Sequence, residues 1–295
     1  MNPIPTQLVL GLSGAGKTTF IAALRHVTEA GDVPDALRLQ TLGDDDMFVN
    51  MIKGRWLKCE PLEHTSADKE RLVRLRLCRA DVGQNAVDLD FPDLAGELIE
   101  QQWSLRRCKE SYAELARSAS GVLLFVHPET IITATCIADA NVAMSALVGE
   151  RNDPPSEASM ERPYNPRDSA TQLKLVELLQ FLIQLRDSGP PIPLAVVISA
   201  WDRVRKTSVG LTTSSPKNWL QESLPLFDQY LRANKSNFCF RVFGLSAQGG
   251  DLQEDLAALQ SLSPSKRILL LNGQSESNNI TLPIQWLAET AGLMT

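Results

Sequence analysis

The chain has 295 residues, of which 43% are hydrophobic and 22% are charged, as in ordinary globular proteins. Its formal net charge of -6 argues against bulk electrostatic binding to nucleic acid or to an anionic membrane. No apolar stretch approaches the ~20 residues of a bilayer-spanning helix, and the first residues lack the features of a signal peptide. The five cysteines are scattered without a C-x-x-C pair, so we expect reduced thiols and a cytoplasmic protein.

The first expected strand, residues 8–11, leads into Gly-Leu-Ser-Gly-Ala-Gly-Lys-Thr at residues 11–18. This segment fits G-x-x-x-x-G-K-[ST] at every fixed position, and a helix is expected directly after it, over residues 18–30. In such a strand–loop–helix arrangement the backbone N–H groups turn inward and the helix dipole favours an anion. We therefore expect residues 11–18 to hold the phosphates of a nucleotide.

Each position of this loop has an expected role. Lys17 would reach the β- and γ-phosphates, and the Thr18 hydroxyl would hold Mg²⁺. The other nucleotide-binding residues of the segment are Gly11, Ser13, Gly14, Ala15, Gly16 and Thr19. After a second helix over residues 47–57, a threonine should close on Mg²⁺ and the γ-phosphate; Thr65 is the first candidate and Thr41 the second.

The next two strands are expected over residues 71–78 and 86–91. Charged and apolar residues alternate imperfectly along the first, which predicts an antiparallel edge strand with one wet face. The second is nearly continuous in apolar residues and is followed by Asp93-Leu94-Ala95-Gly96, which matches D-x-x-G. In that motif Asp93 would bind Mg²⁺ through a water and the Gly96 N–H would sense the γ-phosphate. Asp90, on the strand itself, is the competing aspartate.

The remaining elements alternate between helix and strand. We expect helices over residues 111–118, 172–186, 219–233 and 284–291, and strands over residues 121–126, 194–199 and 238–245, with polar loops at 149–168 and 272–279. This alternation predicts an α/β fold, a three-layer α/β/α sandwich around a mostly parallel sheet. We expect one domain over residues 1–295, with a loop insertion at 149–168.

The strand over residues 194–199 ends in Ser199-Ala200-Trp201-Asp202, at the place where GTPases carry N-K-x-D. The aspartate of that motif accepts two hydrogen bonds from guanine N1–H and N2–H₂, a donor pair that adenine lacks. Asp202 is present, but serine and alanine replace the asparagine and the lysine whose stem would cover the base. Trp201 or Arg203 could cover it instead. The other interpretation of Asp202 is a simple strand-end cap.

The strand over residues 238–245 is followed by Ser246-Ala247-Gln248. The first two residues match the S-A-[KL] element, whose backbone N–H contacts guanine O6. Ser-Ala is a common pair and predicts little alone. Its position, one helix and one strand after Asp202, is what favours this interpretation.

Taken in order, the segments 11–18, Thr65, 93–96, 199–202 and 246–247 resemble the translation-factor-related (TRAFAC) class of P-loop GTPases over nearly the whole chain. Residues 16–27 and 54–65 resemble, within that class, the bacterial double-GTPase group, whose genes lie in multi-gene conflict or phage-defence cassettes. The resemblance implies a switch that binds GTP and GDP, hydrolyses GTP with Mg²⁺, and works with partner or effector proteins.

Hydrolysis in this class is in-line attack of water on the γ-phosphate, and catalysis is mostly positioning and charge stabilisation. The expected catalytic residues are Lys17, Thr65, Gly96 and Glu97. Ras-like proteins place a water-orienting glutamine where Glu97 stands. Because a carboxylate repels the phosphate, we expect slow turnover without a partner.

Other residues near Glu97 are alternatives for its role. Gln101 and Gln102 could orient water, and Arg106 and Arg107 either stabilise charge in cis or are solvated helix-face arginines. The three histidines, His127 among them, show no metal-ligand spacing and are expected to be structural.

Two further functions stay open at this point. An ATPase or small-molecule kinase would use the same phosphate loop, and base preference distinguishes it from a GTPase. A non-hydrolysing, nucleotide-bound scaffold would share the base preference, and turnover distinguishes it.

Overall fold

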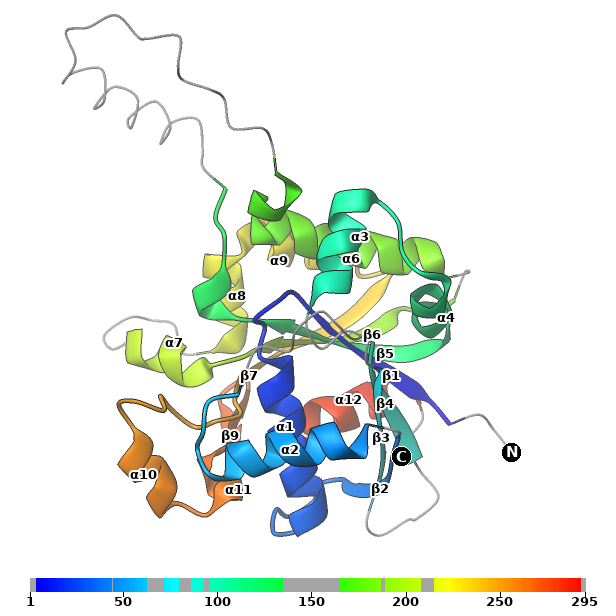
Figure 1. The fold of residues 1–295 in the computed structure, drawn as a ribbon. Helices are drawn as coiled ribbons and strands as arrows, with labels where there is room; N and C mark the ends of the chain where they lie inside the picture. The colour runs from blue at the N-terminus through cyan, green and yellow to red at the C-terminus, as the bar shows by residue number, and fades with distance from the viewer. Residues whose placement is uncertain are drawn as a thin grey trace, which may run out of the picture.

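The computed structural model describes residues 4–43, 45–62, 72–79, 86–92, 96–134, 165–186, 189–207 and 215–292. Across these ranges a single nine-stranded sheet runs through the molecule, and helices cover both of its faces (Figure 1). The predicted three-layer α/β/α sandwich is confirmed. None of the helices in the described ranges is both long and apolar enough to cross a membrane.

The strands are β1 Thr6–Gly11, β2 Arg38–Leu42, β3 Val73–Cys78, β4 Ala86–Phe91, β5 Ala119–Val126, β6 Ile192–Ile198, β7 Phe238–Ser246, β8 Leu269–Asn272 and β9 Ser275–Ser277. The helices are α1 Lys17–Ala30, α2 Asp46–Leu57, α3 Glu97–Leu105, α4 Glu110–Ser118, α6 Thr171–Leu185, α7 Trp201–Thr207, α8 Pro216–Ser223, α9 Pro225–Ala233, α10 Leu256–Ser261, α11 Pro264–Arg267 and α12 Leu282–Thr290. Two short 3₁₀ turns are η1 Pro128–Thr130 and η2 Pro166–Asp168.

The strand order is β2-β3-β4-β1-β5-β6-β7-β8-β9. The central strands from β4 to β7 are parallel, and antiparallel strands flank them at both ends. The antiparallel strand predicted over residues 71–78 is β3, but it is not the outermost strand because β2 pairs beyond it. The prediction also missed β2 and the β8–β9 hairpin, part of which replaces the loop expected at 272–279.

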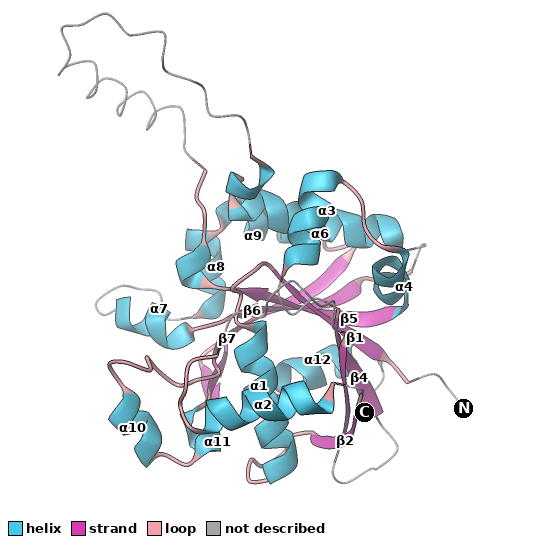
Figure 2. Cartoon of the chain, viewed as in Figure 1, coloured by secondary structure: helices cyan, strands magenta, loops and turns pink. Residues whose placement is uncertain are grey.

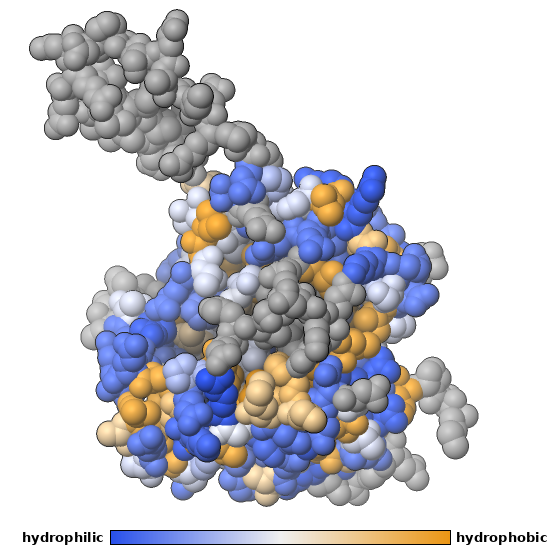
Figure 3. Space-filling model, viewed as in Figure 1, coloured by the Kyte–Doolittle hydropathy of each residue, from blue (hydrophilic) through white to orange (hydrophobic). Residues whose placement is uncertain are grey.

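The two faces of the sheet bury separate hydrophobic cores. Along β1, Leu8 and Leu10 join the core under α3, α4, α6, α8 and α9, whereas Val9 joins the core under α1, α2 and α12. This alternation follows from the two-residue period of a strand, and Figure 2 shows the two helical layers on either side of the sheet. On the face drawn in Figure 3, apolar residues form separate patches among polar ones. The carboxyl end of buried β1 thereby presents residues 12–16 at the edge where such sheets bind ligands.

The helix predicted over residues 219–233 is instead two helices, α8 and α9. They are separated at Leu224, whose φ of -133° is not helical. Pro225, which follows, disfavours the helical region for the residue before it and has no N–H to donate. Of the insertion expected at 149–168, residues 149–164 lie outside the described residues, and η2 lies at its end.

Two arginine–aspartate pairs bridge β3 and β4. Arg74 lies opposite Asp90 and Arg76 opposite Asp88. The Arg74 guanidinium donates to both oxygens of Asp90 at 2.6 Å, and its hydrogen bond to that carboxylate raises the pKa of Arg74. The Asp90 side chain is 0% exposed, and the Arg74 guanidinium provides the ion pair that offsets its removal from water. Asp90, the competing metal-binding candidate, is therefore engaged in holding the sheet together.

We predict that Arg74→Leu lowers the free energy of unfolding by about 3 kcal/mol, because it leaves the buried Asp90 carboxylate without its partner. Urea denaturation of the full chain measures this loss.

Arg117→Leu provides the matched control, since it removes an ion pair to Glu110 at 2.8 Å whose two side chains are 47% and 73% exposed. It should cost less than about 1 kcal/mol. Equal losses in the two variants would show that the cross-strand pair has no special weight.

Candidate functional site

The loop between β1 and α1 depends on glycine backbone conformations. Gly14 has a φ of +71° and Gly16 a φ of +89°, both in the left-handed region. Gly16 is also the residue before α1, and its carbonyl accepts the Phe20 N–H at 3.0 Å as the helix begins. The first turn of α1 therefore faces the loop with its N-terminal N–H groups, which is the arrangement of an anion site.

Lys17 lies in this loop with only 1% of its surface exposed. Its ammonium donates to the Gly11 carbonyl at 2.6 Å and to the Leu12 carbonyl at 3.1 Å. Burial deprives the Lys17 ammonium of hydration by water. An anionic ligand beside it and beside the N–H groups of the first helical turn would compensate for that loss. The donor chemistry of the loop thus fits a phosphate chain.

Neighbouring segments approach the phosphate loop closely at two glycines, Gly96 and Gly16. A Cβ added to Gly96, whose φ is +81°, would lie 2.3 Å from the Ser13 nitrogen. A Cβ added to Gly16 would lie 3.0 Å from the Cβ of Ser199. The segments after β4 and β6, which carry the predicted D-x-x-G and base-side elements, are therefore brought to the loop.

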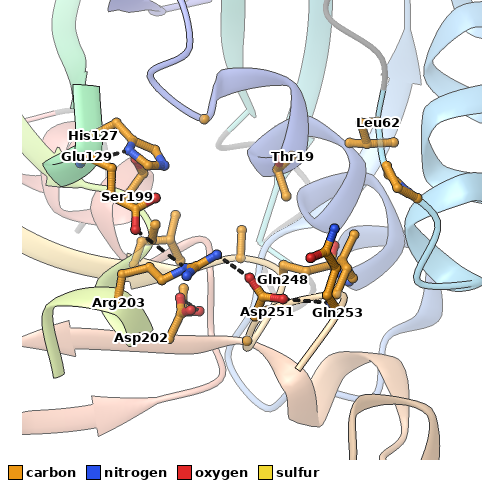
Figure 4. A pocket seen from close by; sticks show the side chains of 18 of the residues that line it. Thr19, Leu62, His127, Glu129, Ser199, Asp202, Arg203, Gln248, Asp251 and Gln253 are labelled. Atoms are coloured by element: carbon orange, nitrogen blue, oxygen red, sulfur yellow. Dashed lines mark hydrogen bonds and ion pairs between the residues drawn. The ribbon is translucent and has the colours of Figure 1, made fainter. Parts of the chain in front are cut away.

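A pocket of about 510 Å³ adjoins the loop at the carboxyl ends of the parallel strands (Figure 4). Its lining comes from the segments 16–19, 60–62, 127–129, 199–203 and 245–253. Thr19, Ser199, Asp202, Ser246 and Ala247, all predicted to bind nucleotide, contribute to this lining.

Hydrogen bonds fix the predicted base-side residues to one another. The Ser246 hydroxyl donates to the carboxylate of Asp202 and accepts the Gly249 N–H at 3.2 Å. The indole N–H of Trp56 in α2 donates to the Ala247 carbonyl at 3.1 Å. Asp202 and the Ser246-Ala247 turn thus form one wall of the pocket, although 44 residues separate Asp202 from Ser246.

The residues Ser199, Ala200 and Trp201, which stand in place of N-K-x, differ from one another in their surroundings. The Ser199 hydroxyl donates to the Val126 carbonyl at 3.2 Å, and Ala200 adopts a positive φ of 46°. Trp201 is 1% exposed, and its ring lies 2.6 Å from where a Cβ of Gly244 would be. The suggestion that Trp201 covers the base is therefore wrong, because its ring packs in the core; Arg203 lines the pocket instead.

Charged residues form a rim on the base side of the pocket. Arg203 pairs with Asp251 and has its Nε 3.8 Å from Glu129. The backbone N–H groups of Glu254 and Gln253 donate to Asp251 and hold the pKa of its carboxyl below the usual value. The sequence analysis missed Asp251 and Glu129. A sequence signal for Asp251 does exist: basic residues in 203–206 follow one expected strand, and acidic residues in 251–255 follow the next.

His127 also lines the pocket, although it was expected to be structural. Burial lowers the pKa of its imidazole, against the opposing influence of Glu129 and Asp202, so the ring is neutral at pH 7. Its Nδ1 accepts the backbone N–H of Glu129 at 3.2 Å, which assigns the proton to Nε2. The pocket thus includes a neutral imidazole beside a carboxylate.

Several predicted residues cannot be placed at the site. Thr65, Asp93 and the side chain of Glu97 lie outside the described residues. Thr18 is the second residue of α1, directly after Lys17. Thr41, the second candidate for the closing threonine, is exposed on the edge strand β2 and does not line the pocket.

The alternatives to Glu97 are not brought to the pocket. Gln101 is exposed, and Gln102 is 3% exposed where α3 meets α6. Arg106 forms an ion pair with Glu177 of α6, and Arg107 is exposed. In this arrangement neither glutamine nor Arg106 lines the pocket beside the phosphate loop.

The family model described as Double-GTPase 1 matches residues 8–287. The chain belongs to the Double-GTPase 1 family. The resemblance to the double-GTPase group, drawn from residues 16–27 and 54–65, is thereby confirmed, and with it the assignment to the P-loop GTPases. A search of curated proteins found no match.

Several solved structures are similar at low identity. The Arl6 BBS3 small GTPase from Trypanosoma brucei, with a bound nucleotide analogue, aligns over 99% of this chain and 100% of its own, with 11% identity and a TM-score of 0.42. The signal recognition particle receptor complex SRb-GTP/SRX from Chaetomium thermophilum covers 88% of this chain and 98% of its own, with 13% identity and a TM-score of 0.39. Similarity at this level has no bearing on the activity of this chain.

We predict that Gly96→Ala weakens nucleotide binding about tenfold, because strain of this kind amounts to about 1–3 kcal/mol at a site that touches the phosphate loop. The new Cβ can be accommodated only by moving Ser13. Titration with a fluorescent GDP analogue measures the change.

Gly54→Ala is the control, because a Cβ at that helical position meets nothing within 4 Å. Its affinity should equal that of the wild type. A Gly96→Ala protein that binds as tightly as Gly54→Ala would contradict the close approach of Gly96 to the loop.

Proposed function

We propose that this protein binds guanine nucleotide with Mg²⁺ and hydrolyses GTP to GDP and phosphate. The observation that carries the proposal is the Asp202 carboxylate, held by Ser246 in the wall of a pocket that adjoins the phosphate loop. Membership of the Double-GTPase 1 family supports binding of GTP.

Base choice follows from the chemistry of Asp202. A carboxylate accepts from both the N1–H and the N2–H₂ of guanine, and adenine offers no such pair of donors. The hydrogen bond from Ser246 orients the carboxylate before any ligand arrives. The backbone N–H of Ala247 in the adjoining turn is our candidate donor to guanine O6.

The phosphate loop would hold the remainder of the nucleotide. Its N-terminal N–H groups and the Lys17 ammonium would neutralise charge on the β- and γ-phosphates, and the Thr18 hydroxyl is the proposed metal ligand of this segment. Thr65 and Asp93 are proposed to complete the metal site. Mg²⁺, when bound, adds positive charge at the phosphates and so lowers the cost of charge that develops in hydrolysis.

For hydrolysis we propose that water attacks the γ-phosphate in line, with Gly96, Lys17 and Thr65 fixing the geometry. The close approach of Gly96 to Leu12 and Ser13 supports this assignment, because it brings the Gly96 backbone to the phosphate loop. Glu97 would accept a hydrogen bond from the water but would also repel the phosphate. We therefore propose slow turnover in the absence of a partner.

We further propose that the protein acts in the cytoplasm as a nucleotide-dependent switch with partner proteins. Residues 60–62 line the pocket and lead toward Thr65, so nucleotide occupancy and the conformation of that segment would be coupled. A role in a multi-protein, anti-phage system is proposed from the resemblance to the double-GTPase group.

We predict that wild-type protein loaded with Mg²⁺ prefers GTP over ATP and XTP, and that Asp202→Asn shifts the preference toward XTP. An asparagine amide donates where the carboxylate accepted, and xanthine presents an acceptor at that position. Competition of the three nucleotides against a fluorescent GDP analogue measures both preferences. Equal binding of ATP by the wild type would make Asp202 a structural cap and favour an ATPase or kinase.

We predict single-turnover hydrolysis of GTP that depends on Mg²⁺ and falls about a hundredfold in Lys17→Met, because a positioned cation at the developing charge is lost. Phosphate release after mixing with excess protein measures the rate. Lys53→Met is the control, since Lys53 of α2 pairs with Glu29 of α1 at 2.7 Å and does not line the pocket. Tight GTP binding without any turnover in the wild type would instead identify a non-hydrolysing scaffold.

A further inference from the structure

The base-side wall of the pocket lacks one long side chain. In N-K-x-D the lysine stem covers the base, but Ala200 occupies that position and contributes no more than a methyl group. Trp201, the next residue, is turned into the core against Gly244. A purine in this pocket would therefore have one face uncovered unless another residue covers it.

Arg203 is placed to do so. It is the third residue of α7, lines the pocket, and keeps 36% of its side chain exposed, so the guanidinium is accessible to a ligand. Figure 4 shows the guanidinium between Glu129 on one side and Asp251 on the other, beside Asp202. Planar guanidinium groups stack on aromatic rings, and purines have aromatic faces.

The position of Arg203 is fixed by Asp251, which lines the same pocket. Its guanidinium donates to the Asp251 carboxylate, which in turn accepts the Gln253 N–H at 2.6 Å and the Glu254 N–H at 3.0 Å. Lys206, one turn further along α7, pairs with Asp255 at 2.8 Å. Lys206 also pairs with Glu254 at 3.2 Å, so three ion pairs join α7 to the segment after β7 and hold the Arg203 guanidinium in place before a base arrives.

We propose that Arg203 covers the purine base of the bound nucleotide, that Asp251 locks it in that position, and that this pair sets how long the nucleotide stays bound. The proposal rests on the guanine-nucleotide binding proposed above. It assigns Arg203 the contact that Ala200 cannot make, and it makes Asp251 a positioning residue that acts through Arg203.

The test compares Arg203→Met, Asp251→Asn, the double variant and Arg203→Lys with the wild type. Dissociation of a fluorescent GDP analogue should be about tenfold faster in Arg203→Met, which corresponds to the loss of one cation–π contact. Asp251→Asn should act in the same direction, and the double variant should match Arg203→Met because the two residues act as a unit. Arg203→Lys should restore part of the residence time.

Two measurements separate this contact from general damage to the pocket. Competition by tripolyphosphate, which has no base, should be the same in Arg203→Met and the wild type. Arg205→Met is the matched control on the same helix: it breaks the pair with Glu276 at 3.1 Å but removes no pocket residue. Its GDP dissociation rate should equal that of the wild type.

Wild-type dissociation rates in Arg203→Met, additive effects in the double variant, or an equal loss of tripolyphosphate affinity would each overturn the proposal. A wild type that binds no GDP would overturn the proposed function, and this assignment with it. A wild type that binds GDP but does not depend on Arg203 would overturn the assignment alone.

Discussion

The site depends on the close approach of backbone to backbone around the phosphate loop. Gly96 lies so close to Ser13 that a Cβ does not fit between them, and a Cβ on Gly16 would lie only 3.0 Å from the Cβ of Ser199. The segments that follow β4 and β6 thus both meet the loop that follows β1. Such contacts are open to glycine because it has no side chain and tolerates positive φ. Within the same loop the buried ammonium of Lys17 donates to the carbonyls of Gly11 and Leu12.

The base side of the pocket is built by polar contacts rather than by glycine. Ser246 at the end of β7 donates to Asp202 at the start of α7, and Trp56 of α2 donates to the next residue along, Ala247. Beyond them, Arg203 and Asp251 join the same two segments by charge. The pocket wall is thus held before any ligand binds, which lowers the ordering cost of binding.

The outer parts of the sheet serve a different purpose. At one end β3 and β4 present Arg74 and Asp90 away from the core under α1, so polar residues on that face satisfy one another across the strands. At the other end the β8–β9 hairpin covers β7, which would otherwise be an exposed edge. These additions protect the central parallel strands, and the loops at their carboxyl ends build the site.

The sequence by itself determined the layered fold and the places where chemistry collects. Local patterns carry this information: the spacing of the phosphate loop, and the apolar strands that end at residues 199–202 and at Ser246. Such patterns involve residues that are close in the sequence, so they can be recognised without knowing the tertiary contacts. The tertiary structure decided which of the alternative candidates lie at the pocket and which have a structural role. The register of β3 and β4 places Arg74 opposite Asp90, so that aspartate forms an ion pair. Packing against Gly244 places the Trp201 ring in the core. The contact of α7 with the segment after β7 brings Arg203 to Asp251. Those outcomes depend on contacts between residues far apart in the chain, which the spacing of residues along the chain does not encode.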